Sequence, residues 1–463
     1  MLFFILFYLF CIAKTEIFSS IATLKMLIGA ERDIPVMIHN YIEKEMERLN
    51  YLKKFAEEVQ MRSENAVADG EDHITHPVNA FLLIKGMTSD WLKVVGLMRS
   101  NSADDFIRNV SYQRILQKIN YPTQEDLAGA AIGLLRLQDT YRLSTKDIAN
   151  GKILNSKIRS SALSANDCFE IGRAAYNDYD YYHTIMWMQE AKDRLEKEVR
   201  PTASLEDILE YLAFAIYKQG NLKRALLLTD ELYKLNPNHP RAKGNVKWYE
   251  DLLEEDGVRR TEMRRNIPPL VNMRHDGGLE HSERDIYEAL CRNEIPTSIK
   301  AQSRLYCYYK MDRPYLRLAP IKVQIMRQNP LAVLFVDIMS DEEARVIEQL
   351  AVPKLNRATV QNAATGNLEY ASYRISKSAW LKGHDHEVID RFNKRLDMAT
   401  NLEMETAEEL QIQNYGVGGH YDPHFDCARS LVYEKEEKNA FKDLGTGNRI
   451  ATILVYVSFF FLP

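Results

Sequence analysis

The chain has 463 residues and a formal net charge of −5, with 60 basic residues against 65 acidic ones. This balance gives no basic face that would bind nucleic acid. Five cysteines are too few to build the fold from disulfides, and the length allows about three domains of ordinary size.

Residues 1–13 form an apolar run that is followed by Lys14, Thr15 and Glu16. The run is shorter than the roughly 20 residues of a membrane-spanning helix, and it is typical of a cleaved secretory signal peptide. A buried N-terminal helix is the alternative. No later run is long enough to span a bilayer, residues 453–463 included. We therefore expect a soluble protein of the secretory pathway.

Residues 14–145 are predicted to be a helical region. Between Ile34 and Val59 apolar residues recur three to five positions apart, which indicates a long amphipathic helix. Such a helix can pair with a second copy as a coiled coil or cover a small core. Further helical patterns occupy residues 91–98 and 127–143. Asn109 begins a glycosylation triplet, so on a luminal protein it should be exposed.

Residues 146–255 contain pairs of helical segments. Tyr217, Gly220, Ala225 and Pro237 follow the spacing of a tetratricopeptide repeat, with a plain helical hairpin as the alternative. Stacked helix pairs of this type leave a concave groove that accepts extended peptide. The aromatic rings here would suit a polyproline II helix, or would fill the core. They are Tyr176, Tyr179, Tyr181, Tyr182, Tyr211, Tyr217 and Trp248. Cys168, in an apolar helical pattern, should be a buried thiol.

Residues 256–285 mix arginines with prolines and glycines and show no period, which predicts a linker. From residue 286 to 463, short apolar runs separated by turn residues predict the strands of a double-stranded β-helix, or jelly roll. These runs are residues 332–336, 411–415 and 449–457. One helix is expected at residues 341–350, where Ser340 and Glu343 have the spacing of a capping box. The predicted fold class is therefore multidomain α + β, with helical regions before a β-rich domain.

His424 and Asp426 lie two residues apart in a segment whose neighbours predict an extended chain. Alternate residues of a strand point to the same side, so both side chains could meet one ion. An imidazole and a carboxylate are two of the three protein ligands in a facial non-haem Fe(II) site. The third ligand, a second His, normally comes from a later strand. An ordinary surface His and Asp are the alternative.

Several segments resemble the alpha subunits of collagen prolyl 4-hydroxylases. They are residues 76–81, 135–141, 407–411, 414–426 and 445–452. The resemblance covers nearly the whole chain. It implies a dimerising region in residues 14–145, a peptide-substrate-binding domain in residues 146–255, and a 2-oxoglutarate- and Fe(II)-dependent dioxygenase domain in residues 286–463.

The resemblance also implies roles for individual residues. His424 and Asp426 would bind Fe(II), and the hydroxyls of Tyr415 and Thr452 would donate to 2-oxoglutarate. The residues that would position the peptidyl proline are Arg374, Ser376, Glu408 and Tyr421. Matching peptide-binding positions in the helical domain are Tyr211, Arg241 and Asn245, while Phe214 and Trp248 stand where the family often has Tyr. Cys291 and Cys307 match a disulfide pair, and Cys427 has no assigned role.

The chemistry implied by the resemblance is hydroxylation at C4 of proline in X-Pro-Gly repeats of collagen-like chains, with 2-oxoglutarate, dioxygen and ascorbate. The implied partner is protein disulfide isomerase, the beta subunit of an alpha2beta2 tetramer in the lumen of the endoplasmic reticulum. The sequence has no retention signal of the lysine-aspartate-glutamate-leucine type, which agrees with retention by a partner.

The sequence departs from the family after Thr452, because no His follows His424 and the Lys that would pair with 2-oxoglutarate is absent. His420 lies about 13 Å from His424 along an ideal strand, too far to share an ion. His384 and His386 fall in a polar turn. We therefore expect an incomplete jelly roll with weak affinity for iron and an exposed apolar run at residues 459–461. The alternative function is a non-catalytic luminal protein that binds proline-rich peptides and carries a vestigial oxygenase domain.

Overall fold

The computed structural model describes most of the chain, in residues 17–69, 77–100, 103–104, 106–108, 122–154, 156, 160–274, 281–361, 367–427 and 448–457. The chain divides into two compact units, residues 22–121 and residues 1–21 with 122–463. The predicted signal peptide, the acceptor Asn109 and residues 459–461 lie outside the described residues.

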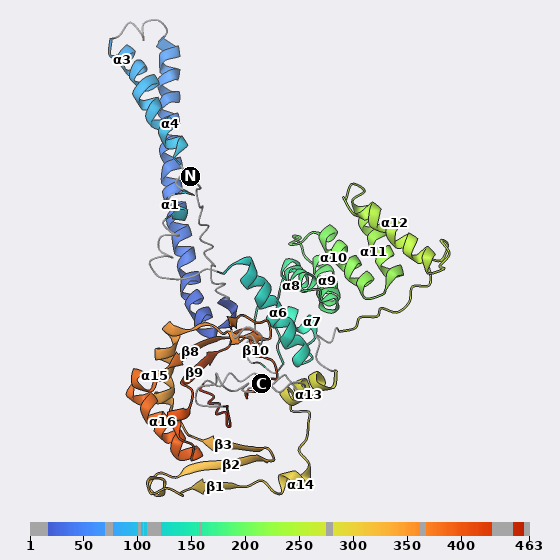
Figure 1. The fold of residues 1–463 in the computed structure, drawn as a ribbon. Coiled ribbons are helices and arrows are strands. Elements are labelled where there is room, and N and C mark those ends of the chain that lie inside the picture. Colours follow the sequence, from blue (N-terminus) through green and yellow to red (C-terminus); the bar gives the residue numbers. More distant parts are fainter. Residues whose placement is uncertain are drawn as a thin grey trace, which may run out of the picture. The chain divides into compact units, whose positions relative to one another are not determined.

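The smaller unit is built on α1 (Ile21–Asp69), a helix of 49 residues. It continues with α3 (Pro77–Lys85), a π-helical turn (Gly86–Asp90) and α4 (Trp91–Arg99). Helix α4 runs beside α1 (Figure 1), and Arg48 of α1 donates to the carbonyl of Leu97 at 3.3 Å. The predicted long helix is thus confirmed, with wider bounds. In the described part of the chain, no helix has the length and apolar character needed to cross a membrane.

The helical part of the larger unit contains the predicted helix pairs. Its helices are α6 (Gln124–Thr140), α7 (Thr145–Ala149), α8 (Ala165–Asn177), α9 (Tyr181–Leu195), α10 (Leu205–Lys218), α11 (Leu222–Leu235) and α12 (Ala242–Glu255). Thr123 and Ser164 begin α6 and α8 with capping boxes, which satisfy free amides of the first turn. Trp187, Ile208 and the predicted thiol Cys168 are fully buried in one core.

The predicted linker is only partly a linker. Helix α13 spans His281–Cys291, so it begins inside the predicted linker and continues into the region predicted to be strands. Met263 is fully buried in the core of the helical domain. Residues 271–273 pair with side chains of the helical domain. The Arg, Pro and Gly content of residues 256–285 could not indicate this packing, because the packing depends on partners far away in the sequence.

The C-terminal part combines short antiparallel sheets with two main helices, α15 (Asp341–Ala351) and α16 (Glu387–Thr400). One sheet contains β1 (Cys307–Lys310), β2 (Ile321–Gln328) and β3 (Leu331–Val336), and follows α14 (Ile299–Gln302). A second has the order β4 (Asn356–Arg357), β8 (Lys377–Leu381), β9 (Leu410–Asn414). Two-stranded ladders join β5 (Val360–Gln361) to β6 (Leu368–Glu369), and β7 (Arg374–Ile375) to β10 (His420–Tyr421).

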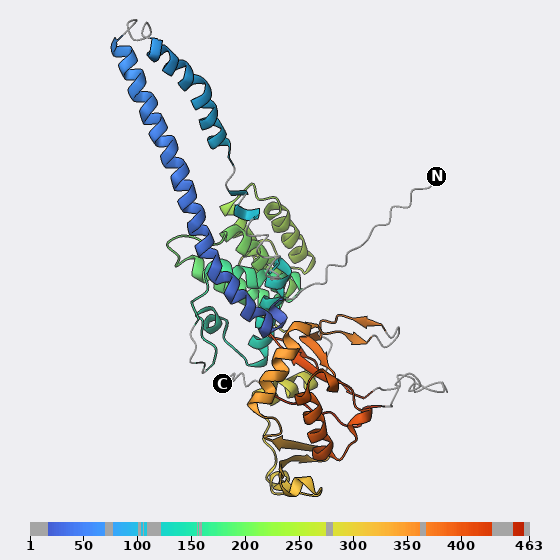
Figure 2. The same ribbon diagram turned by 90° about the vertical axis from the view of Figure 1, so that its left-hand side faces the viewer.

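Helices α15 and α16 cover one face of the second sheet (Figure 2). Ile347 of α15, Ile389 of α16 and Leu381 of β8 are buried together there. The capping box predicted at Ser340 and Glu343 is present. The strands expected at residues 332–336 and 411–415 are β3 and β9 within one residue. The strand expected at residues 449–457 is wrong, because the described residues there have no strand pairing. A jelly roll is not confirmed.

Candidate functional site

His424 and Asp426 come together although the segment that carries them is not the predicted strand. Strand β10 ends at Tyr421, and the chain bends after it. Nε2 of His424 nevertheless lies 3.2 Å from Oδ1 of Asp426. Nδ1 of His424 lies 2.7 Å from the carbonyl oxygen of Asp422, which can only accept, so Nδ1 carries the proton. Nε2 is the ring nitrogen that faces the carboxylate.

This pair fits part of a metal site. Imidazole nitrogen and carboxylate oxygen both bind metals at about 2 Å, so one ion could bridge atoms 3.2 Å apart. Among the described residues, no group of three His, Cys, Asp or Glu side chains is placed to hold a metal. His420 forms a separate contact, with Nε2 3.5 Å from Asp422, and burial lowers its pKa to about 4.

The carboxylate of Asp426 is held by residues from the segment after residue 447. The hydroxyl of Thr452 donates to Oδ2 of Asp426 at 2.5 Å. Arg449 donates to Glu408 through Nη2 at 2.7 Å, and its Nη1 lies 3.9 Å from Asp426. The Arg449 guanidinium lowers the pKa of the Glu408 carboxyl. Two predicted site residues, Thr452 and Glu408, thus adjoin the metal pair, and Arg449 is a neighbour that sequence reasoning missed.

On the other side of His424 lies a stack of flat side chains. The Tyr421 ring is 3.6 Å from the His424 ring, and the Arg374 guanidinium lies 4.8 Å from the centre of Tyr421. Arg374 also donates to the carbonyl of Thr359 at 2.8 Å, while its buried Nε has no hydrogen-bond partner among the residues that the structure describes. A cation over a ring fixes the orientation of both groups. Fully buried Ser376 follows β7, one position after Ile375.

Tyr415 follows the end of β9. Its hydroxyl donates to Gln413 at 2.5 Å, and burial raises its pKa. The hydroxyl therefore remains a donor at neutral pH. The structure thus brings His424, Asp426, Tyr421 and Arg374 into one cluster through direct contacts.

The glycine-rich segment before the metal pair is packed against helix α6, a contact that the sequence did not reveal. A Cβ at Gly133 would overlap the carbonyl oxygen of Val417, and Nε of Arg136 donates to the carbonyl of Gly418 at 3.0 Å. Gly418 has φ of +57°, which favours glycine. A glycine inside the predicted helix 127–143 was the available signal, since Gly weakens a helix interior unless close packing requires it.

The predicted peptide-binding residues lie along a chain of aromatic contacts in the helical domain. The Tyr211 ring lies 4.7 Å from Tyr176, and Tyr217 lies 4.8 Å from Trp248. Arg241, at the start of α12, donates to Glu210 at 3.0 Å, and Asn245 follows one turn later. These rings are only partly buried, which leaves surface for a ligand.

The predicted disulfide is not formed in the structure. Cys291 and Cys307 are both free thiols. Cys291 ends α13, where its thiol is a hydrogen-bond partner of Tyr287, and Cys307 is exposed at the start of β1. The expectation is therefore corrected to two separate thiols in this conformation.

Two family profiles match the helical regions. One, described as "Prolyl 4-Hydroxylase alpha-subunit, N-terminal region", matches residues 20–155. The other, described as "Prolyl 4-hydroxylase peptide-substrate-binding domain", matches residues 165–255.

Similarity to individual proteins extends through the whole chain. It is 58% identical over 446 residues to prolyl 4-hydroxylase subunit alpha-1 of Caenorhabditis elegans, covering 96% of this chain and 78% of the relative. It is 53% identical over 450 residues to subunit alpha-2 of the same organism, covering 96% and 81%. It is 42% identical over 453 residues to subunit alpha-1 of Homo sapiens, covering 96% and 83%.

Proposed function

Because the chain belongs to the family of prolyl 4-hydroxylase alpha subunits, we propose that it hydroxylates C4 of proline in X-Pro-Gly repeats of collagen-like chains. The observation that carries this proposal is the pairing of His424 Nε2 with Asp426 Oδ1 at 3.2 Å, beside the Tyr421 ring and the Arg374 guanidinium. The relatives are named as hydroxylases, so they do not favour the alternative of a non-catalytic peptide-binding protein.

In this proposal His424 and Asp426 hold Fe(II), which supplies oxidising chemistry when 2-oxoglutarate and dioxygen are bound. Ascorbate keeps the iron reduced. Thr452 fixes the rotamer of Asp426 by donating its one hydroxyl proton to that carboxylate, and Tyr415 donates its own to Gln413. In this proposal each hydroxyl turns from that partner to donate to 2-oxoglutarate when the cosubstrate binds.

The peptidyl proline is positioned by side chains that already constrain one another. Tyr421 is fixed between its two neighbours, with the His424 ring 3.6 Å and the Arg374 guanidinium 4.8 Å from its ring centre. Ser376 and Glu408 complete the set, with Glu408 held by Arg449.

The helical domain holds a proline-rich segment of the same substrate. The partly buried rings of Tyr211, Tyr217 and Trp248 match a polyproline II helix, which loses little entropy on binding. The further features of the proposal are a jelly-roll catalytic domain, a protein disulfide isomerase partner in an alpha2beta2 tetramer, and residence in the lumen of the endoplasmic reticulum. Their support is the resemblance to the family.

The test is 2-oxoglutarate turnover by the chain co-expressed with protein disulfide isomerase, with (Pro-Pro-Gly)n peptide, Fe(II) and ascorbate. Two protein ligands should bind iron weakly, so we expect hydroxyproline to form in step with succinate only when Fe(II) is supplied in excess, and to be lost in His424→Ala. His384→Ala is the matched control, because that imidazole is 81% exposed and outside the cluster. Equal turnover by the native chain and His424→Ala would contradict the proposal.

A further inference from the structure

Helix α6 contacts the peptide-binding domain and the segment that carries the metal pair. Its end nearer the C-terminus carries Asp139, which reaches His183 of α9 with Oδ1 3.1 Å from Nε2. Its middle carries Gly133 and Arg136, which contact Val417 and Gly418. The two sets of contacts are six residues apart or less on one helix, so α6 joins α9 of the helical domain to the segment that precedes the metal pair.

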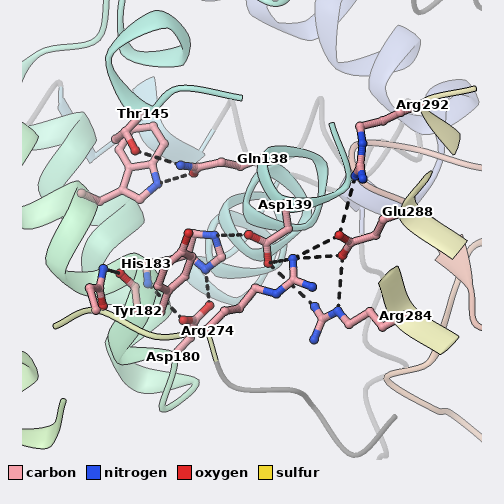
Figure 3. Close-up of polar contacts among 12 residues, drawn as sticks. Gln138, Asp139, Thr145, Asp180, Tyr182, His183, Arg274, Arg284, Glu288 and Arg292 are labelled. Atoms are coloured by element: carbon pink, nitrogen blue, oxygen red, sulfur yellow. Dashed lines mark hydrogen bonds and ion pairs between the residues drawn. The ribbon is translucent and has the colours of Figure 1, made fainter. Parts of the chain in front are cut away.

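The contact at Asp139 belongs to a larger group of charges that we call the charged hub (Figure 3). The charged hub consists of Asp139, Asp180, His183, Arg274, Arg284, Glu288 and Arg292. Both ring nitrogens of His183 contact carboxylates: Nε2 lies 3.1 Å from Asp139, and Nδ1 lies 2.5 Å from Asp180. Arg274 lies between the two carboxylates of different elements, 3.6 Å from Asp139 and 3.0 Å from Glu288. Buried charges of this kind are costly to separate, because each would lose its partner without regaining water.

Arg274 is fixed to the peptide-binding domain by the chain that precedes it. Asn221 makes two hydrogen bonds with the backbone of Val271, at 2.6 and 2.8 Å. Gln219 makes two with the backbone of Met273, at 2.9 and 3.2 Å. These amide side chains pair with alternate residues of an extended chain, as a neighbouring strand would. Arg274 therefore links the helical domain to the charged hub, and Glu288 links α13 to it.

At the other contact, α6 meets the glycine-rich segment backbone to backbone. A Cβ at Gly418 would overlap the carbonyl oxygen of Gly133, so each glycine allows the close approach of the other. The amide of Val417 donates to the carbonyl of Phe18 at 3.2 Å, on the residues that precede α1. His420 and the metal pair follow a few residues later, so a shift of α6 would move the start of that segment.

We propose that α6 couples the peptide-binding helices to the metal-ligand segment, with Asp139 and Gly133 as its positioning residues. A proline-rich chain held by α10 and α12 is then presented at a fixed place relative to His424 and Asp426. That the two sites bind peptide and metal rests on the proposed function, whereas the coupling between them through α6 does not.

The test is hydrogen exchange, read by mass spectrometry, on the full chain and its Asp139→Asn variant. Asp139→Asn keeps the shape of the side chain and removes the charge that holds His183 and Arg274. We expect faster exchange in residues 414–421, at the other contact of α6, and unchanged exchange in α15 as a sign of intact folding. Asp139→Glu should restore slow exchange, because it returns the carboxylate.

Glu283→Gln is the matched control, since Glu283 lies on α13, is exposed and makes no hydrogen bond or ion pair in the described residues. It should leave residues 414–421 unchanged. If Asp139→Asn speeds exchange around His183 alone, the hub is a local structure and the coupling is overturned.

Peptide addition supplies a second readout. A (Pro-Pro-Gly)n peptide should slow exchange in α10, α12 and residues 414–421 of the native chain, and in α10 and α12 alone in Asp139→Asn. Slowing confined to α10 and α12 in the native chain would overturn the coupling. Absence of peptide binding to the native chain would count against the proposed function instead, and the exchange rates without peptide would still decide the coupling.

Discussion

Glu343 shows how one buried carboxylate can serve two elements. It closes the capping box at the start of α15 by accepting from the backbone amide of Ser340 at 3.0 Å. The same carboxylate accepts from both Nη atoms of Arg395 on α16, at 2.8 and 2.9 Å. These hydrogen bonds, led by Arg395, lower its pKa to about 2. The capping box was predictable because Ser340 is three residues away, whereas the partner Arg395 was not.

Replacing the buried Glu343 with Gln should lower the free energy of unfolding by about 2 kcal/mol, because the partly buried Arg395 guanidinium would lose its anion. Its folded-state pKa lies below the ordinary 4.5, so its stabilisation is present above pH 4.5 and lost as the pH falls towards 2. Urea denaturation across this range measures both effects. Glu342→Gln is the control, since its pair with Arg345 is exposed and should change stability by less than about 0.5 kcal/mol. Equal effects of the two variants would contradict the assignment.

His183 has the opposite pH dependence. Burial works against its charge, but the hydrogen bonds that the imidazole donates to Asp139 and Asp180 outweigh burial and raise its pKa to about 9 from 6.5. Its stabilisation should therefore be complete below pH 6.5 and be lost as the pH rises through 9. The difference in unfolding free energy between the native chain and His183→Gln should shrink over this interval.

A series of urea titrations at different pH values measures this difference. The exposed His384, replaced by Gln, is the control and should change the free energy of unfolding by less than about 0.5 kcal/mol. A difference for His183→Gln that grows with pH would show that the imidazole is neutral in the folded chain. The sequence could not predict these contacts of the charged hub, since Asp139 and His183 belong to different helices and have the sequence pattern of ordinary surface residues.

At the scale of elements, local signals predicted more than long-range ones. Repeat spacing located α8 to α11, and short apolar runs between turn residues located β3 and β9, because both patterns record residues that each element buries. The expected strand at residues 449–457 was wrong, since an apolar run does not say whether a partner strand lies beside it. His424 and Asp426 come together through a bend rather than on the expected strand. The two-residue spacing therefore predicted that the side chains lie close together, but the strand geometry that explained the prediction was wrong.

The contact between α6 and the glycine-rich segment predicts that a Gly to Ala substitution in this helix lowers stability instead of raising it. Replacing a glycine inside a helix by Ala normally stabilises by about 1 kcal/mol. Gly133→Ala should instead destabilise the chain and loosen residues 414–421, because its Cβ would overlap the carbonyl of Val417. Gly244→Ala in α12 is the matched control, since nothing lies within 4 Å of its Cβ position. Thermal unfolding should give a lower Tm for the first variant and an equal or higher Tm for the second; equal gains would contradict the close contact.

At the scale of the whole molecule, the chain separates its roles between two compact units. The larger unit contains the peptide-binding helices, the charged hub and the metal pair. The smaller unit contains none of these and instead leaves apolar side chains of α1 in solvent. Ile38, Ile42, Met46 and Leu49 are between 44% and 57% exposed and recur three or four residues apart, so they share one face of the helix.

A continuous apolar stripe on a long helix is the surface that a second copy would cover. We predict that the chain self-associates through this face, and that the double variant Ile38→Glu with Ile42→Glu shifts it to monomer without loss of helicity. Sedimentation velocity measures the association and circular dichroism the helix. Glu43→Gln with Glu47→Gln is the matched control, because both carboxylates are exposed on the same helix. A native chain that stays monomeric would contradict the self-association. A double variant that still associates would place the interface elsewhere, since charges buried on this face would cost several kcal/mol without partners.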